Sequence, residues 1–539
     1  MGGGGLLQLV AVGSQDCVLT GNPQITFFRT VFRRHTNFAL ETIRNNFVGE
    51  PNFGGRSSIT ISRTADLVSK SYIRVVVGGG TAMGDAKWAW VKNLGHALLR
   101  SVEFTIGGQR IDYHTSDWYH MWHELTKSPA LERGYDKLIG NTTELTTLAA
   151  SHDQATLYIP LQFFFCRHVG QAVPLIGLQY HEVKFEISFE ELNNLIISTG
   201  FAPGTNVGES LGLKILDATL ECGMIYLDTD ERRRFSVNAH EILIEQVQIA
   251  AIETAAVSTA SSKKTLLTIN HPVKELVWGV HTGRMANTSG AYQYLWYHPT
   301  DLDAMRLIAT KRFVLALAKY SGSGSGSGND LVLANTATDT NSILPQVGLS
   351  GTLLTKFNNI KAAGVSTDAT VDNVAILGDL LSLDDISTPV SVLFAGINNN
   401  RPANGHGSTL YDVVVKMPHN FGVYMDGTVN PLLLANLQLN GQDRVREQDA
   451  AYYNYLQPYE HHSHTPADGI NVYSFAISPE EHQPSGTLNF SRIDIANLVT
   501  TLDSAYSAQI GTDSTLIVMG LSYNILRIMS GMAGLAYNS

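Results

Sequence analysis

The sequence predicts an all-β protein made of two large sandwich domains. Apolar and polar residues alternate along much of the chain, as at residues 58–62, 101–106 and 181–189, and this period of two is typical of half-buried strands. Convincing amphipathic helices are scarce. The 539 residues suit two all-β domains of about 200–250 residues each.

The first residues of the chain predict a flexible arm, which we place at residues 1–22. Glycines at positions 2–5 give the backbone freedom, and Leu6, Leu7 and Leu9 supply apolar side chains that adhere to another surface. This composition favours an arm that becomes ordered on a neighbouring molecule. The alternative is a first strand within the domain that follows.

Two short helices are expected to decorate the strands, at residues 116–126 and 229–235. Thr229 and Asp230 are expected to cap the second helix, which carries three consecutive arginines. Because this second segment has the densest charge in the chain and interrupts the strand pattern, we place the domain junction there. The resulting division is a first domain at 23–228, a connecting segment at 229–240 and a second domain at 241–539.

The two halves of the chain share a weak internal similarity. Residues 104–111 resemble residues 437–445, since in both a strand turns at Gly-Gln into a segment that bears arginine. Strand patterning then resumes at 157–165 and at 470–477. An aromatic cluster lies between these segments in each half: Trp118, Tyr119 and Trp122, then Tyr452, Tyr453 and Tyr455. This order indicates two related β domains, with chance similarity of turn composition as the alternative.

The second half is longer because of a polar region within residues 283–410. It contains a pure Gly/Ser tract at 321–328, which cannot form a core. We interpret the region as long loops at one end of a sandwich, since strand-like sequence, including residues 411–417, lies on both sides. A linker between domains is the competing interpretation of the Gly/Ser tract.

Composition excludes several classes of protein. A formal net charge of −11 argues against a protein that coats nucleic acid directly, because the longest basic run, Arg232 to Arg234, follows three acidic residues. Cys17, Cys166 and Cys222 are too few for a disulfide framework and are expected to be small core residues. We expect neither a signal peptide nor a lipid anchor, and residues 516–537 make a poor membrane span. The protein is therefore expected to be soluble and intracellular at synthesis.

No catalytic, cofactor-binding or metal-binding residue is predicted. Nucleotide-binding glycine motifs and the GxSxG elbow are absent from the sequence. Histidines gather at 461–464 and at His120 and His123, beside Glu124, but neither spacing matches a known zinc motif. We interpret the first group as a polar turn and the second as an aromatic packing face. The acidic pairs at 384–385 and 480–481 are interpreted as solvated loop charges.

Three N-glycosylation acceptor sequences occur, at Asn141, Asn287 and Asn489. Three in 539 residues is close to what chance gives. These asparagines are candidate sites of sugar attachment, although no secretory signal accompanies them.

Several long segments resemble the major capsid proteins of nucleocytoplasmic large DNA viruses. The opening resembles the start of that family, residues 230–235 its inter-domain connection, and two late segments its C-terminal signatures. The matching stretches are residues 6–16, 19–28, 33–39, 230–235, 479–494 and 523–537. They extend from one end of the chain to the other and are longer than any of the motifs rejected above.

The resemblance implies a double jelly roll, that is, two tandem eight-stranded jelly-roll sandwiches in one chain. It also implies a homotrimeric capsomer of pseudo-hexagonal outline that tiles the icosahedral shell of a virion assembled inside the infected host cell. Expected partners are neighbouring capsomers, minor capsid or cement proteins, penton proteins and inner membrane-associated proteins, without direct contact to nucleic acid. The sequence alone leaves two alternatives, a jelly-roll glycan-binding (lectin-like) module and a β-sandwich carbohydrate hydrolase.

Overall fold

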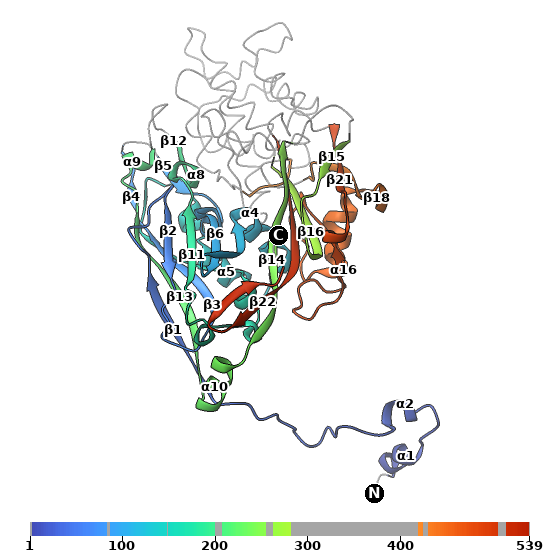
Figure 1. The fold of residues 1–539 in the computed structure, drawn as a ribbon. Coiled ribbons are helices and arrows are strands. Elements are labelled where there is room, and N and C mark those ends of the chain that lie inside the picture. Colours follow the sequence, from blue (N-terminus) through green and yellow to red (C-terminus); the bar gives the residue numbers. More distant parts are fainter. Residues whose placement is uncertain are drawn as a thin grey trace, which may run out of the picture.

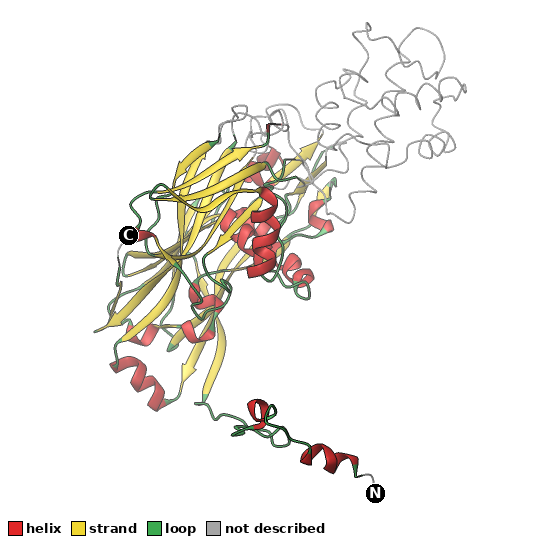
Figure 2. Cartoon of the chain, turned by 90° about the vertical axis from the view of Figure 1, so that its right-hand side faces the viewer, coloured by secondary structure: helices red, strands yellow, loops and turns green. Residues whose placement is uncertain are grey.

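Two β-sandwiches lie side by side in the computed structural model, and an extended N-terminal segment projects from one end (Figure 1). Strands form the body, and short helices pack against them (Figure 2). The structure describes residues 3–83, 87–147, 149–199, 207–254, 262–281, 419–423, 429–504 and 514–537.

The first sandwich is a jelly roll formed by strands up to Leu227. One sheet has the order β1-β13-β3-β10, with β9 also paired to β3, and the facing sheet has the order β2-β11-β6-β7. The strands are β1 (Phe38–Asn46), β2 (Arg56–Thr60), β3 (Leu67–Val77), β6 (Leu99–Ile106), β7 (Gln109–Thr115), β9 (Ala155–Pro160), β10 (Val173–Pro174), β11 (Val183–Phe189) and β13 (Ile215–Leu227). Two small ribbons accompany it: β4 (Gly80–Thr81) with β8 (Ser151–His152), and β5 (Lys87–Trp90) with β12 (Ile196–Thr199).

The second sandwich repeats this topology with strands from His240 onward. Its sheets have the orders β14-β22-β16-β19 and β15-β21-β17-β18, with β20 and β23 added at the first sheet. The strands are β14 (His240–Thr254), β15 (Lys263–Leu266), β16 (Pro272–His281), β17 (Leu432–Leu439), β18 (Gln442–Asp449), β19 (Ile470–Ser474), β20 (Leu488–Asn489), β21 (Ala496–Leu502), β22 (Thr515–Met529) and β23 (Met532–Leu535). When the eight principal strands of each half are numbered in sequence, both halves show the sheet orders 1-8-3-6 and 2-7-4-5. This is the jelly-roll order, so the predicted double jelly roll is confirmed.

Alternating burial along the strands builds the cores. In β11, Val183, Phe185, Ile187 and Phe189 are buried while the residues between them are partly exposed, as the predicted period of two requires. In β22, by contrast, both faces are buried. Its odd and even positions pack into two different apolar clusters, so its sequence reads as an almost continuous apolar run.

Both predicted helices are present. Helix α4 spans Ser116–Thr126, the predicted residues, and α10 spans Thr229–Val237, two residues beyond the prediction. The predicted cap of α10 was wrong, because the Asp228 carboxylate accepts the backbone N–H of Thr229 at 2.8 Å while Thr229 and Asp230 lie inside the helix. The remaining helices are α1 (Gly4–Val10), α2 (Cys17–Thr20), α3 (Leu94–Leu98), α5 (Glu132–Ile139), α6 (Thr143–Thr146), α7 (Phe164–Arg167), α8 (Leu192–Leu195), α9 (Val207–Ser210), α16 (Gln457–His461) and the π-helical turn η7 (Tyr452–Leu456).

The other strand predictions differ in detail. The predicted strand at 157–165 ends at Pro160, and a helical turn from Phe164 buries three consecutive phenylalanines in the first core, which a strand could not do. The strand at 470–477 ends at Ser474. The predicted loops within 283–410, with the Gly/Ser tract, and the strand at 411–417 lie outside the described residues.

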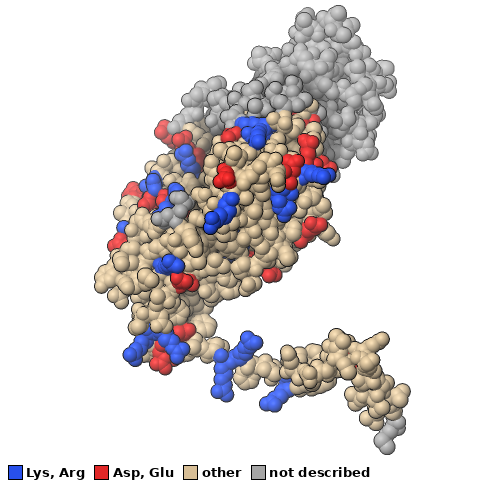
Figure 3. All heavy atoms as spheres, turned by 45° about the vertical axis from the view of Figure 1, so that its right-hand side comes forward, with Lys and Arg blue, Asp and Glu red and all other residues tan. Residues whose placement is uncertain are grey.

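The N-terminal segment lies away from the body up to the start of β1 at Phe38. It carries the short helices α1 and α2, and its apolar side chains, including Leu7, Val10 and Phe28, are exposed. Arg29, Arg33 and Arg34 lie in the same segment, and Figure 3 shows basic side chains along it. In the part of the chain that the structure describes, no helix has the length and apolar character of a membrane span.

Candidate assembly interface

Helix α4 of the first jelly roll packs against the second. Thr115 caps it by accepting the backbone N–H of Trp118 at 3.4 Å. The spacing i, i+3, i+4, i+7 then places four buried side chains on one face: Trp118, Met121, Trp122 and Leu125. This face contacts the outer face of the β14-β22-β16-β19 sheet, where the partners include Val277, Val472 and Met519. The contact is apolar and buried, and close packing of this kind joins the two jelly rolls rigidly.

Strand β14 covers the edge of β7 through polar contacts. The Asp112 carboxylate accepts the backbone N–H of Val247 at 3.0 Å, and the Gln246 side chain donates to the carbonyl of Ile111. The second Asp112 oxygen lies 2.9 Å from Nε2 of His114. These bonds satisfy groups that an open edge strand would leave to solvent or to another chain.

A buried charge cluster reinforces the same junction. Glu245 of β14 binds Nη1 of Arg167 and Nζ of Lys274, each at 2.7 Å. The guanidinium of Arg167 also stacks on Trp122 of α4, 4.1 Å from the ring centre. Burial lowers the pKa of Lys274, and Glu245 opposes that shift. One carboxylate thus holds two cations, one from each jelly roll.

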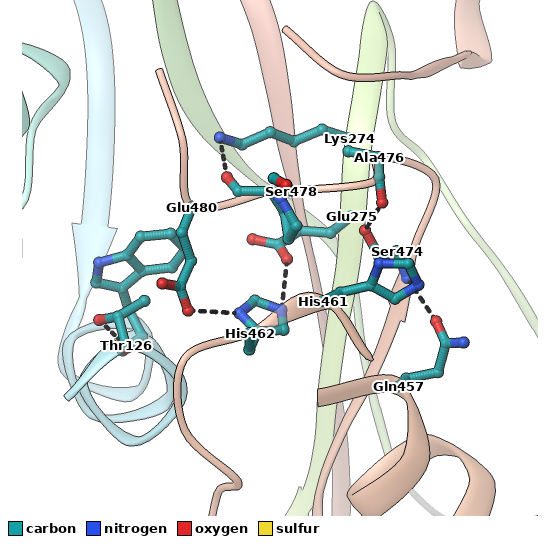
Figure 4. A network of polar contacts seen from close by, with 12 residues as sticks. Thr126, Lys274, Glu275, Gln457, His461, His462, Ser474, Ala476, Ser478 and Glu480 are labelled. Atoms are coloured by element: carbon teal, nitrogen blue, oxygen red, sulfur yellow. Dashed lines mark hydrogen bonds and ion pairs between the residues drawn. The ribbon is translucent and has the colours of Figure 1, made fainter. Parts of the chain in front are cut away.

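A second buried network, drawn in Figure 4, contains a histidine between two carboxylates. Nε2 of His462 lies 3.0 Å from Glu275 of β16, and Nδ1 lies 3.2 Å from Glu480. Ser463 also donates its backbone N–H to Glu480 at 2.8 Å. Burial disfavours a charged imidazole, but Glu275 and Glu480 outweigh burial and raise the pKa of His462 to about 9. His462 is therefore an imidazolium at neutral pH.

This network corrects two interpretations made from the sequence. Glu480 is not a solvated loop charge: burial alone would raise its pKa, but hydrogen bonds from His462 and Ser463 lower it. The side chain of His462 is fully buried and is therefore more than part of a polar turn. Its neighbours His461 and His464 contact different carbonyls, those of Ile477 and Glu124 respectively.

The histidines of α4 pack among aromatic rings, as the sequence predicted. His120 stacks on His419 at 5.2 Å and His123 on Tyr135 at 4.1 Å between ring centres. Burial lowers the pKa of His123 and of His419 to about 4, so both are neutral at pH 7. Among the described residues, no three potential metal ligands converge on one point.

The glycosylation acceptors have different surroundings. Asn141 is half-buried and donates its side-chain amide to Asp136 at 3.0 Å. Asn489 is exposed, although its side-chain Oδ1 accepts the backbone N–H of Ser491. Asn287 lies outside the described residues. Sugar attachment at these sites stays a prediction.

An open apolar groove lies on the second jelly roll, beside the edge strand β18. It has a volume of about 590 Å³ and runs along η7 and the start of α16. Its lining consists of Gln448, Asp449, Ala451, Tyr452, Tyr455, Leu456, Tyr459 and Thr465. The tyrosine cluster here was apparent from the sequence, but the groove was not predicted.

Several residues of these buried networks were not predicted from the sequence. Lys274 and Glu275 interrupt the apolar run of β16, and a charged pair inside a buried strand is a signal for ion-pair partners elsewhere. Lys274 pairs with Glu245, and Glu275 pairs with His462. Both partners come from other elements of the fold, so the sequence alone could not have identified them.

Comparison with known proteins gives full-length matches. The family described as "Major capsid protein N-terminus" matches residues 26–220, and the family "Large eukaryotic DNA virus major capsid protein" matches 231–342 and 352–534. A major capsid protein of Phaeocystis pouchetii virus is 39% identical, with 99% of this chain and 100% of the relative covered. Capsid protein 1 of Acanthamoeba polyphaga mimivirus is 36% identical, with the same coverage.

Solved structures agree with these sequence matches. A chain of the PBCV-1 virus capsid has 28% identity and a TM-score of 0.61, with 95% of this chain and 100% of that chain covered. The Faustovirus major capsid protein, at 13% identity and a TM-score of 0.56, supports the fold. None of these similarities supports the glycan-binding alternative. Because sequence matches span both jelly rolls, this chain belongs to the family of major capsid proteins of large eukaryotic DNA viruses.

Proposed function

We propose that three copies of this chain close into one capsomer of pseudo-hexagonal outline, and that such capsomers tile an icosahedral shell. The observation that carries this proposal is the repetition of one jelly-roll topology within a rigid chain. Three such chains supply six similar pillars, and a closed three-fold ring satisfies every contact without open-ended growth. The two pillars of each chain are the domains placed at 23–228, whose first strand begins at Phe38, and at 241–539, joined by the segment 229–240.

The family membership makes the chain a subunit of the virus capsid shell. Such a subunit acts by associating with other subunits and proteins of the shell. We infer a structural and non-enzymatic role, in which the capsomer contacts neighbouring capsomers, minor capsid or cement proteins, penton proteins and inner membrane-associated proteins. The net charge of −11 disfavours direct contact with nucleic acid. The exposed apolar and basic arm suits a segment that becomes ordered on one of these partners.

The mass of the purified full-length chain tests the trimer. Light scattering during gel filtration should give three times 58.7 kDa, about 176 kDa, and electron microscopy of concentrated material should show sheets or shells. A species of 58.7 kDa at every concentration, without assemblies, would contradict the proposal.

A further inference from the structure

Four histidines form a cluster at the junction between the two jelly rolls. His96 lies in α3, His120 and His123 lie in α4, and His419 lies in the segment before β17. Figure 1 shows α4 between the two sandwiches. The ring centres of His419 and His120 are 5.2 Å apart. His96 lies 6.4 Å from His120 and 5.7 Å from His123, measured between ring centres. This histidine cluster therefore extends from the first jelly roll to the second.

The interior of the histidine cluster is closed to water. His96, His120 and His419 are each at most 3% exposed. Within the part of the chain that the structure describes, the Nδ1 atoms of these three side chains have no hydrogen-bond partner. Nε2 of His96 lies 2.7 Å from the hydroxyl of Tyr135. Because a buried charge without a partner is far more costly than a buried neutral ring, this packing suits only the uncharged imidazoles.

The carboxylates of α4 and α5 beside the cluster bind other groups. Asp117 lies 3.0 Å from Nε2 of His281, at the end of β16. Glu124 and Glu132 both bind Nζ of Lys127, at 3.3 Å and 3.2 Å. Each of these acidic side chains already has a cationic or histidine partner outside the cluster, so it compensates a charge on the cluster only weakly.

The other facing groups do not compensate such a charge either. Glu190 acts on His419, but it accepts a hydrogen bond from the side-chain amide of Asn194 at 2.7 Å. Three basic side chains also face the cluster and oppose further positive charge there: Lys127, His281 and His464. His462 differs in this respect, because a carboxylate lies at each of its two ring nitrogens.

These surroundings keep the histidine cluster neutral. Burial lowers the pKa of His123 and of His419 from 6.5 to about 4. Burial and the neighbouring histidines lower the pKa of His96 and of His120 well below the ordinary value. Imidazoles that reach water after release of α4 bind protons near pH 6.5, so the released form holds more protons than the packed form below that pH. The stability of the packed form is therefore complete above pH 6.5 and is lost as the pH falls through 4.

We propose that the junction is an acid-sensitive contact, in which protonation of the histidine cluster releases α4 from the second jelly roll. Charged His120 and His419 stack 5.2 Å apart beside the apolar face of α4, and their repulsion separates the two elements. The release is local, because Glu245 still binds Arg167 and Lys274 at the same junction. A shell built from this chain then weakens in an acidic compartment. That consequence rests on the proposed function, whereas the release of α4 does not.

Hydrogen exchange of backbone amides, followed by mass spectrometry of the full-length chain at pH 7 and pH 5, tests the release. After correction for the intrinsic pH dependence of exchange, the protection of α4 should fall at least about a hundredfold, since each freed histidine contributes roughly twentyfold over this range. The protection of β11, in the core of the first jelly roll, should stay constant. Unchanged protection of α4 at pH 5, or an equal loss in β11, would overturn the inference.

Two variants assign the acid response to the histidine cluster. His120→Phe and His419→Phe keep an aromatic ring in the stack but bind no proton. Each should keep the wild-type protection at pH 7 and reduce the acid-induced loss in α4 at least about fivefold. The control is His482→Phe, because His482 stacks on the exposed His168 at 5.0 Å, away from α4. It should respond to acid as the wild type does.

A full acid response in both cluster variants would contradict the inference, and so would an equal reduction in the control. If a cluster variant does not fold, the comparison of α4 with β11 in the wild type still decides the question. A chain that releases α4 at pH 5 but forms no capsomer would contradict the proposed function and leave this inference intact.

Discussion

His462 shows how a single residue links distant parts of the second jelly roll. It lies after α16, yet it contacts Glu275 of β16 and Glu480 of a later loop. A buried carboxylate is costly without a partner, so the imidazolium stabilises the fold chiefly by compensating Glu275. The free energy that His462 contributes to folding therefore depends on pH.

Protein stability should fall as the pH rises from 6.5 to 9. The pKa of His462 is raised from 6.5 to about 9 in the folded chain, so its stabilisation is complete below pH 6.5 and is lost as the pH passes 9. A shift of this size corresponds to roughly 3 kcal/mol. Urea denaturation at pH 6 and pH 9.5 measures this difference in the free energy of unfolding.

The matched variants are His462→Gln and His461→Gln. The first should lose about 3–5 kcal/mol at pH 6, because Glu275 stays buried without its cation, and should lose the alkaline decline. The second should retain the wild-type pH profile, since His461 contacts a carbonyl. An unchanged decline in His462→Gln would refute this account of the network.

Among the elements, helix α4 of the first jelly roll packs its apolar side chains against the second jelly roll. Its outward face fills the space between the sandwiches, and Trp122 additionally carries the guanidinium of Arg167. The helix was predicted to the residue because its apolar spacing is a local signal. What it packs against was not predicted, since that depends on contacts far apart in sequence.

Shortening one buried side chain of α4 should weaken the contact between the two jelly rolls and lower the free energy of unfolding. Trp122→Ala removes a large buried ring and the support of Arg167, and should cost about 3–5 kcal/mol. Leu131→Ala, at an exposed position beyond the same helix, should change the free energy of unfolding by less than about 0.5 kcal/mol. Equal midpoints of thermal denaturation for Trp122→Ala and Leu131→Ala would contradict this packing of α4.

Across the whole molecule, the sequence predicted individual strands better than the contacts between segments that lie far apart in sequence. Alternating strands such as β11 and the paired hairpins of the internal similarity were recognised because their period is local. The stretch at 516–537 was judged as a poor membrane span, and its residues 523–537 as similar to the capsid family, but it was not recognised as a strand although most of β22, which is buried on both faces, lies there. Burial on both faces removes the alternation that identifies a strand, and the ion-pair partners of β16 carry no local signal.

Among the described residues, the arm carries apolar side chains that stay exposed, such as Leu7, Val10 and Phe28. Deletion of residues 1–20 should leave folded capsomers, because α1 and α2 bury no side chain, but should impair assembly of shells. Circular dichroism and gel filtration check the capsomer, and electron microscopy checks the shells. Intact shells from the truncated chain would refute a role for the arm in assembly.

The proposed capsomer is a ring of three chains in which one jelly-roll topology appears six times. Cryo-electron microscopy of the purified oligomer, at a resolution that shows helices, tests this arrangement. We predict a three-fold ring of six similar sandwiches from three chains. A two-fold dimer, or a three-fold particle without six similar sandwiches, would contradict the proposed capsomer.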